Sequence, residues 1–224
     1  DTAITITGLN LVNSVTYYMS VRGTNTDGAV SDTIRSDGVF IDNEKPVISL
    51  VSETATDVDW FADNMADTIV VAATDNYGIK GYEFGYGSVP GITSSAWTLA
   101  DTNTAALDIS ALREGELYYS NVRVKDSTGQ VANGYSDGFR VDRTPPVAGT
   151  VEVAAGVDSV LLKWSGFSDA LSGLKSYYYY LTESALHTPI IPRTTVGLVD
   201  SIKFKIQDLV VGKTYYVPFS AVDT

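Results

Sequence analysis

Parts of this sequence return roughly a hundred residues later, and this repetition constrains the fold more than any other feature. Residues 15–22 return at 117–123, with the paired tyrosines at an offset of 101 residues, and a third copy lies at 214–219. Residues 36–42 return in the same way at 136–142. A period of this length matches one small β domain and is far longer than a solenoid repeat. We therefore expect a tandem array of similar domains.

Each repeat consists of short segments that alternate apolar and polar residues and are rich in Val, Ile, Thr, Tyr and Phe. Gly, Asn, Asp and Pro separate these segments, a pattern typical of strands and turns. The segment 94–107 carries polar residues where a helix would need an apolar stripe, so we expect almost no helix. Seven strands are expected in the middle repeat, near 47–51, 68–74, 79–86, 96–99, 106–110, 117–125 and 134–142. Seven short strands at this spacing indicate an antiparallel sandwich.

Two motifs carry a family resemblance. Residues 112–118 and 209–215 share a Leu, a Gly three residues later and a Tyr three residues after that. Trp164 lies in an alternating segment placed like the buried Trp of the second strand. With these motifs the chain resembles fibronectin type III and related immunoglobulin-like repeats of bacterial extracellular surface proteins. The resemblance implies an all-β fold of tandem immunoglobulin-like, fibronectin type III-like, antiparallel β-sandwiches.

The resemblance also implies a structural role for one tyrosine in each repeat. In the tyrosine corner of such domains, a Tyr that opens the sixth strand hydrogen-bonds back to the preceding turn. The matching residues here are Tyr17, Tyr118 and Tyr215.

The repeat boundaries divide the chain into three parts. We expect the C-terminal strands of one sandwich at 1–45, a complete sandwich at 46–144, and a sandwich without its last strand at 145–224. The expectation is a window cut from a longer array. The connections 41–46 and 141–146 are short and contain proline, which fixes φ and extends the preceding residue, so we expect stiff joints.

Composition limits the partners. The sequence is 44% hydrophobic, enough for a packed core, and has a formal net charge of −12. An acidic surface repels phosphate, so we expect no nucleic acid partner. No apolar run approaches the ~20 residues of a membrane helix, so we expect no membrane insertion. Without cysteine, disulfides and thiolate chemistry are excluded.

The sequence offers no catalytic constellation. Its one histidine, His187, lies in an irregular segment, and no G-x-S-x-G, P-loop, dinucleotide or zinc motif occurs. A triad requires a positioned base and a residue that orients it. We therefore expect a protein that is not an enzyme and needs no cofactor, apart from calcium as an open alternative.

Calcium is open because acids gather at the joints and turns. Carboxylate oxygens on loops are the ligands that Ca²⁺ selects, but it needs six to eight, and no D-x-D-x-D-G loop is present. Asp and Asn also stabilise turns by bonding the backbone two residues on, and this interpretation is favoured. The calcium candidates are Asp42, Asp75, Asp142 and Asp169, with Asp126 and Asp223 at further turns.

Aromatic residues suggest a second binding candidate. In the run 177–180, four consecutive tyrosines place two rings on each face of a strand. Tyr178 and Tyr180 on one face are candidates for a glycan platform. The favoured interpretation is packing within the sandwich and cross-strand pairing.

These features favour a non-catalytic structural or adhesive segment of a secreted or cell-surface repeat protein, acting as a semi-rigid spacer, stalk or fibre. The alternative is a carbohydrate- or protein-binding accessory module of a secreted hydrolase. Expected partners are neighbouring repeats, copies of the chain that add a strand at an open sheet edge, and a glycan or protein target. The expected location is extracellular or on the cell surface, in a bacterium.

Overall fold

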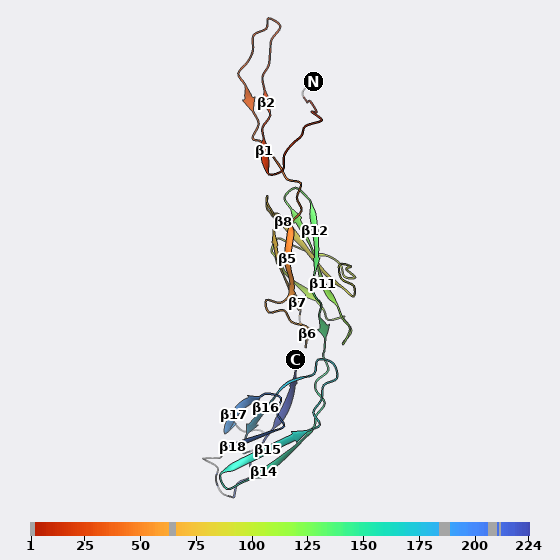
Figure 1. The fold of residues 1–224 in the computed structure, drawn as a ribbon. Coiled ribbons are helices and arrows are strands. Elements are labelled where there is room, and N and C mark those ends of the chain that lie inside the picture. The colour runs from red at the N-terminus through yellow and green to blue at the C-terminus, as the bar shows by residue number, and fades with distance from the viewer. Residues whose placement is uncertain (1–2, 63–65, 184–188, 206–209, 211) are drawn as a thin grey trace. The chain divides into compact units, whose positions relative to one another are not determined.

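The structure is a computed structural model that describes residues 3–62, 66–183, 189–205, 210 and 212–224. Throughout this part of the chain the regular secondary structure is strand, and no helix occurs (Figure 1). None of these residues forms a helix long and apolar enough to cross a membrane. His187 lies outside the described residues.

Two compact units make up the chain, and their boundary falls within the expected middle repeat. The first unit combines Asp1–Asp57, Asp67–Leu107 and Tyr118–Gly138. The second unit combines Val58–Ala66, Asp108–Leu117 and Phe139–Thr224.

The first unit begins with a long antiparallel hairpin. Its inner pair of strands is β2 with β3, and its outer pair is β1 with β4. The bounds are β1 (Val15–Tyr17), β2 (Ser20–Val21), β3 (Ile34–Arg35) and β4 (Val39–Ile41). Apolar side chains of this hairpin are exposed, among them Met19 and Val39. An apolar hollow of about 590 Å³ lies beside them and is lined in part by Leu9 and Leu11.

The rest of the first unit is a sandwich of two antiparallel sheets. One sheet has the order β10-β7-β5 and the other the order β12-β11-β8-β9. Their strands are β5 (Val47–Glu53), β7 (Ala66–Thr74), β8 (Ile79–Gly87), β9 (Thr98–Ala100), β10 (Thr104–Asp108), β11 (Tyr119–Asp126) and β12 (Val131–Tyr135). The core consists of one inward-facing row from each sheet: Ile69, Val71 and Leu107 from one, and Phe84, Val122 and Val124 from the other. The alternation of buried and exposed residues along β11 is the period of two that the sequence predicts.

One expected strand is divided. The segment 134–142 forms two strands, β12 and β13 (Arg140–Val141), because the Ser136 side chain takes the place of its carbonyl in the ladder with Ser120. The backbone N–H of Ser136 donates to the carbonyl of Ser120 at 2.9 Å, and its Oγ accepts from the Ser120 N–H at 3.0 Å. Gly138 then adopts φ 110°, a left-handed conformation that favours glycine. The expectation of one continuous strand was therefore wrong.

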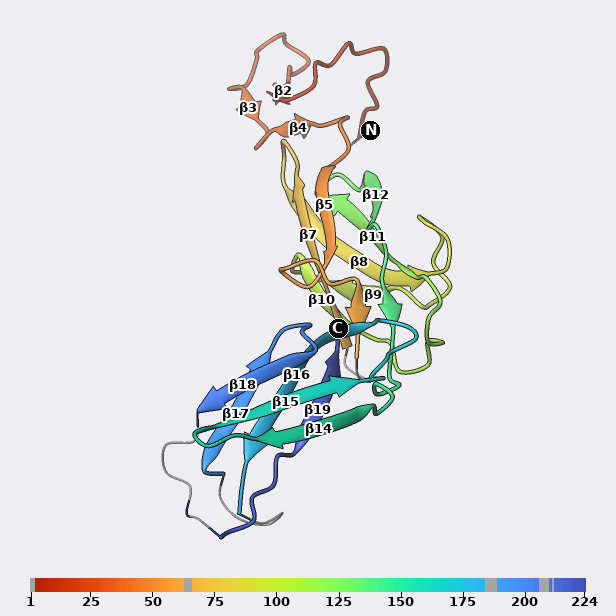
Figure 2. The same cartoon turned by 60° about the horizontal axis from the view of Figure 1, so that its bottom comes forward.

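The second unit contains a short parallel pair and a second sandwich. Strand β6 (Trp60–Phe61), which the pattern did not predict, pairs parallel with β13. The two sheets of the sandwich have the orders β14-β15-β18 and β17-β16-β19 and stack face to face (Figure 2). Their strands are β14 (Thr150–Ala155), β15 (Ser159–Ser165), β16 (Leu174–Leu181), β17 (Ile191–Val196), β18 (Ser201–Lys205) and β19 (Phe219–Asp223).

The core of this second sandwich is aromatic. Trp164 of β15 is buried, as the resemblance predicts, and its ring centroid lies 5.4 Å from that of Tyr177 and 4.5 Å from that of Phe219. Tyr179 is buried in the same cluster and stacks on Phe204. Two of the four consecutive tyrosines therefore belong to the core.

Candidate metal centre

The described residues contain three places where three carboxylates meet. In each, one oxygen from every acid lies within 4.8 Å of the oxygens of the other two. Like charges at this distance repel, so each cluster is costly unless a cation or protons neutralise it. Two of the clusters contain the four calcium candidates that the sequence suggests. They are Asp42 with Asp75 and Asp126, and Asp142 with Asp169 and Asp223.

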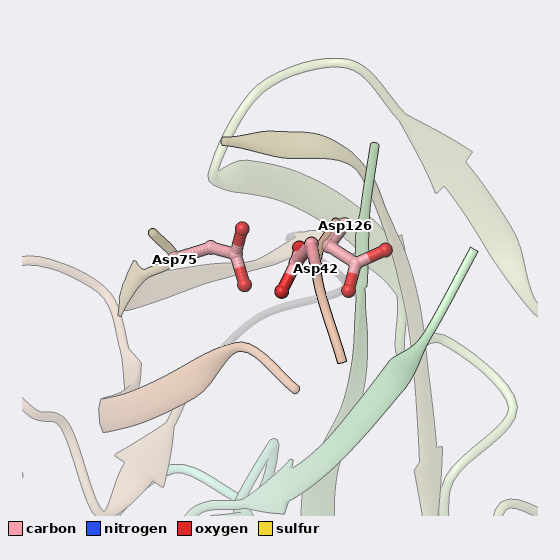
Figure 3. A group of neighbouring side chains, drawn as sticks. All are labelled: Asp42, Asp75 and Asp126. Atoms are coloured by element: carbon pink, nitrogen blue, oxygen red, sulfur yellow. The ribbon is translucent and has the colours of Figure 1, made fainter. Parts of the chain in front are cut away.

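The first of these clusters joins three separate segments of the first unit (Figure 3). Asp42 follows the last strand of the hairpin, Asp75 lies in the turn between β7 and β8, and Asp126 ends β11. We refer to this group as the first joint cluster, because Asp42 belongs to the proline-containing connection 41–46.

In both Asp42 and Asp75, one carboxylate oxygen accepts hydrogen bonds from the backbone and the other has no partner among the described residues. Oδ1 of Asp75 accepts from the N–H groups of Tyr77 and Gly78, both at 2.9 Å. Oδ1 of Asp42 likewise accepts from the N–H of Glu44. Oδ2 of Asp42 and Oδ2 of Asp75 are both buried and have no hydrogen-bond partner among the described residues. Two buried acceptors without partners are costly, and a bound cation would satisfy both.

Asp126 is fully buried and more fully bonded than the other two. Its Oδ1 accepts from the N–H groups of Thr128, Gly129 and Gln130, and its Oδ2 accepts from the Gln130 side chain at 3.1 Å. Burial alone would raise the pKa of Asp126, but the hydrogen bonds from the Thr128 hydroxyl and from the three backbone N–H groups outweigh it and leave the pKa below its ordinary value. The third acid of the cluster is therefore held in its charged form.

Further contacts join the hairpin and the connection after it to the sandwich. The ring of Phe40 stacks on Tyr77 with centroids 4.3 Å apart. The side chain of Gln130 donates to the Glu44 carbonyl at 2.6 Å. The side chain of Asn76 donates to Oγ of Ser14 at 3.0 Å. The first joint cluster thus lies within a set of contacts between residues 14–44 and the turns of the sandwich.

The second joint cluster repeats this arrangement in the second unit. Asp142 follows β13, Asp169 lies in the turn before β16, and Asp223 ends β19. Oδ1 of Asp169 accepts from the N–H groups of Leu171 at 3.0 Å and Gly173 at 2.9 Å. As in Asp75, Oδ1 accepts from the N–H two residues on and from the N–H of the glycine that precedes the next strand, but this glycine is four residues after Asp169 and only three after Asp75.

The acids of the second joint cluster influence one another electrostatically. Burial raises the pKa of Asp223, and the charges of Asp142 and Asp169 raise it further, while a backbone hydrogen bond and the charge of Lys175 offset this only in part. Burial would also raise the pKa of Asp142, but hydrogen bonds from Ser172 and Thr144 outweigh it and lower the pKa. Asp142 is therefore held as the anion, whereas the negative charge around Asp223 destabilises the charged form of its carboxyl.

The third cluster was not suggested by the sequence. It contains Glu53, Asp57 and Asp137, of which only Asp137 lies in a segment that the repeat reproduces. The sequence signal that could have found the first two clusters is their recurrence: all three positions of one have a counterpart in the next repeat. Glu53 has no such counterpart, since Val153 occupies the equivalent place after the next proline-containing joint.

The tyrosine candidates lie as follows. Oη of Tyr17 accepts from the N–H of Val12 and Oη of Tyr215 accepts from that of Val210, both at 2.9 Å and both five residues upstream. The ring of Tyr118 is buried and meets Tyr86 edge-on, with centroids 6.5 Å apart.

The glycan candidates Tyr178 and Tyr180 are half-buried on the outer face of β16. The guanidinium of Arg193 lies 3.6 Å from the ring centroid of Tyr178. This cation covers a ring face that a sugar platform would have to leave open.

The sheets described above define the class of fold: tandem immunoglobulin-like β-sandwiches. The fourth strand of each sandwich, β9 or β17, pairs with the third strand, whereas constant-type immunoglobulin domains place it in the opposite sheet. Both sandwiches therefore differ from constant-type immunoglobulin domains in the sheet to which the fourth strand belongs.

Among solved structures, the chain is similar to one titled "Crystal structure of chicken CNTN1 FN1-FN3 domains". The match covers 95% of this chain and 71% of that chain, with 17% sequence identity and a TM-score of 0.46. No protein-family model matches the sequence, and no curated protein matches it.

Proposed function

We propose that the chain is a non-catalytic structural segment of a secreted or cell-surface protein, bacterial in origin, in which calcium ions hold each proline-containing connection against the turns of the sandwich that follows it. The segment then serves as a semi-rigid spacer, stalk or fibre. The calcium ions would be held by the two joint clusters, one in each unit.

The observation that carries the proposal is the recurrence of one three-acid cluster at both joints. Each cluster takes one Asp from the connection, one from the turn after the second strand, and one from the end of the sixth strand. Asp in a turn needs no second and third acid beside it to stabilise that turn. The turn interpretation therefore accounts for each Asp alone but gives no reason for three to converge twice.

Calcium fits the donor set. Each cluster offers hard carboxylate oxygens from three separate segments, and backbone carbonyls and waters commonly complete the six to eight ligands of Ca²⁺. Two of the oxygens in the first joint cluster are buried and unpartnered. An ion bound there would connect residues of the joint to two turns of the sandwich. This is a mechanical role, and modules outside the cell use such sites with Kd values of about 10⁻⁴ to 10⁻³ M.

Thermal unfolding with calcium and with chelator tests the proposal. A ligand that binds only the folded chain stabilises it by RT ln(1 + [L]/Kd), or about 2.7 kcal/mol for one site at a hundredfold excess over Kd. We expect the melting temperature to rise with calcium concentration and to fall in chelator. An unchanged melting temperature would contradict the proposal.

Asparagine variants separate calcium binding from turn formation. Asp75→Asn and Asp169→Asn retain Oδ1, which accepts the turn hydrogen bonds, and replace only the charged partner oxygen. If turns are the only role, both variants keep the stability of the wild type in every buffer. We expect instead that both variants are at least as stable as the wild type in chelator, because one of the repelling charges is gone, and that each loses the calcium response of its own site. Asp158→Asn, at an exposed acid in the β14–β15 turn, is the matched control for the change of charge.

A further inference from the structure

Glu53 is a carboxylate buried inside the first unit. It is the last residue of β5 and is 0% exposed. Burying an unpaired charge is strongly unfavourable, so a buried carboxylate needs a cation, a proton or several hydrogen-bond donors. The surroundings of Glu53 supply only part of this requirement.

One oxygen of Glu53 has a partner and the other has none. Oε1 accepts from the hydroxyl of Ser136, whose Oγ is itself fixed by the N–H of Ser120. Oε2 is buried and lacks a hydrogen-bond partner among the described residues. Burial raises the pKa of the Glu53 carboxyl, and the hydrogen bonds from Ser120 and Ser136 offset this only in part.

Two exposed acids converge on this buried group. One carboxylate oxygen each from Glu53, Asp57 and Asp137 lie within 4.8 Å of one another. Asp137 follows Ser136 directly, so the same short segment binds one oxygen of Glu53 and brings a second carboxylate beside it. An ordinary surface acid would turn toward solvent and away from a buried anion.

The loop that carries Asp57 is held in an uncommon conformation. Thr54 has φ 61° and Asp57 has φ 57°, both in the left-handed region that residues other than glycine rarely adopt. The Oγ of Ser52 donates to the Thr54 carbonyl at 2.9 Å, and the Thr54 N–H donates to the Thr68 carbonyl at 2.7 Å. Such strain persists where the surroundings impose it, and it is concentrated at functional sites.

We propose that Glu53, Asp57 and Asp137 form a third calcium site, distinct from the two joint clusters and lying within the first unit. Glu53 is the inner ligand, and the two aspartates close the site from the solvent side. Three carboxylates offer up to six oxygens, whereas Mg²⁺ sites in proteins rely on one or two carboxylates and several waters. The ion satisfies the unpartnered oxygen and neutralises the three charges.

The test uses the full chain carrying Asp75→Asn and Asp169→Asn, in which both joint clusters are disabled. Equilibrium dialysis with radioactive calcium counts the ions that remain. We expect one ion per chain, and we expect Asp137→Asn in this background to weaken its binding by roughly tenfold or more, since affinity depends on the number of charged ligands. Asp137 is exposed, so this variant folds irrespective of the outcome.

Two further variants complete the design. Glu53→Gln removes the inner charge at constant size and should abolish the ion, while Asp158→Asn should retain it. Absence of any ion in the parent background, or undiminished binding by the Asp137→Asn chain, would overturn the third site. Displacement of the ion by an equal concentration of magnesium would overturn its assignment to calcium.

These outcomes are independent of the proposed function. If the joints bind calcium and the Glu53 site does not, the parent background binds no ion, but a chain that carries Glu53→Gln alone keeps its two joint ions. If only the joints fail, the parent background still binds one ion.

Discussion

Asp42 and Asp142 make the same backbone contact in successive repeats. Oδ1 of Asp42 accepts from the N–H of Glu44 at 3.1 Å, and Oδ1 of Asp142 accepts from the N–H of Thr144 at 3.0 Å. Each Asp directly follows a short strand and precedes a proline-containing joint. The two joints are therefore built to one plan.

The second joint should become resistant to trypsin when calcium binds. Arg143 follows Asp142, and its guanidinium donates to the carbonyls of Leu112 at 2.9 Å and Ile109 at 2.8 Å. Cleavage after Arg143 requires this segment to open, and a ligand of the closed form reduces the open population by up to 1 + [L]/Kd. We expect calcium to slow cleavage there, as measured by intact mass spectrometry.

Arg22 provides the internal control for this experiment. It lies in the exposed hairpin of the first unit, so its cleavage rate should not depend on calcium. The Asp169→Asn variant should lose the protection at Arg143. Equal protection of Arg143 and Arg22 would point to inhibition of the protease and not to an ion at the joint.

The tyrosine corner of the second unit should contribute measurably to stability. Tyr215→Phe removes the hydroxyl that accepts from the Val210 N–H at 2.9 Å and changes nothing else. A typical hydrogen bond contributes about 0.5 to 1.5 kcal/mol to stability. We therefore expect the free energy of unfolding, measured in urea, to fall by an amount of that size. Tyr216→Phe, at the exposed neighbouring ring, should be close to neutral. Equal effects of the two variants would contradict a special role for Tyr215.

Two glycines of β8 should respond differently to alanine. A Cβ at Gly87 would lie 1.8 Å from the carbonyl oxygen of Ile92, whereas a Cβ at Gly81 would lie 3.5 Å from that of Ala100, an ordinary contact. Overpacking of this kind costs roughly 1 to 3 kcal/mol. We expect Gly87→Ala to lower the unfolding free energy by about this amount and Gly81→Ala to leave it nearly unchanged. Similar unfolding free energies for the two variants would mean that the loop at Ile92 moves aside without a loss of stability.

The sequence predicts the strands well where one face is buried. Alternation over β8 and β11 reflects a real core, with Phe84, Val122 and Val124 on the inner face. The prediction from alternation fails at β12 and β13. The interruption between these two strands depends on the hydrogen bond between the Ser136 side chain and Ser120, a contact between residues distant in the sequence. A propensity pattern carries no information about such a partner.

The candidate acids illustrate the same limit. Asp42 and Asp75 attract notice in the sequence as turn residues, but their convergence with Asp126 depends on how three loops meet in space. The repeat offers a partial signal, since the same three positions recur. Glu53 gives no signal at all: it ends an apolar strand, and only its burial and its unpartnered oxygen distinguish it.

The central claim, that both joints bind calcium, is tested most directly by counting ions in a chain whose third cluster is disabled. In the Glu53→Gln background, equilibrium dialysis should find two calcium ions per chain, one for each joint cluster. Adding Asp75→Asn should leave one ion, and adding Asp169→Asn as well should leave none. A Glu53→Gln chain that binds no calcium, or that binds it equally after both aspartates are replaced, would contradict the account.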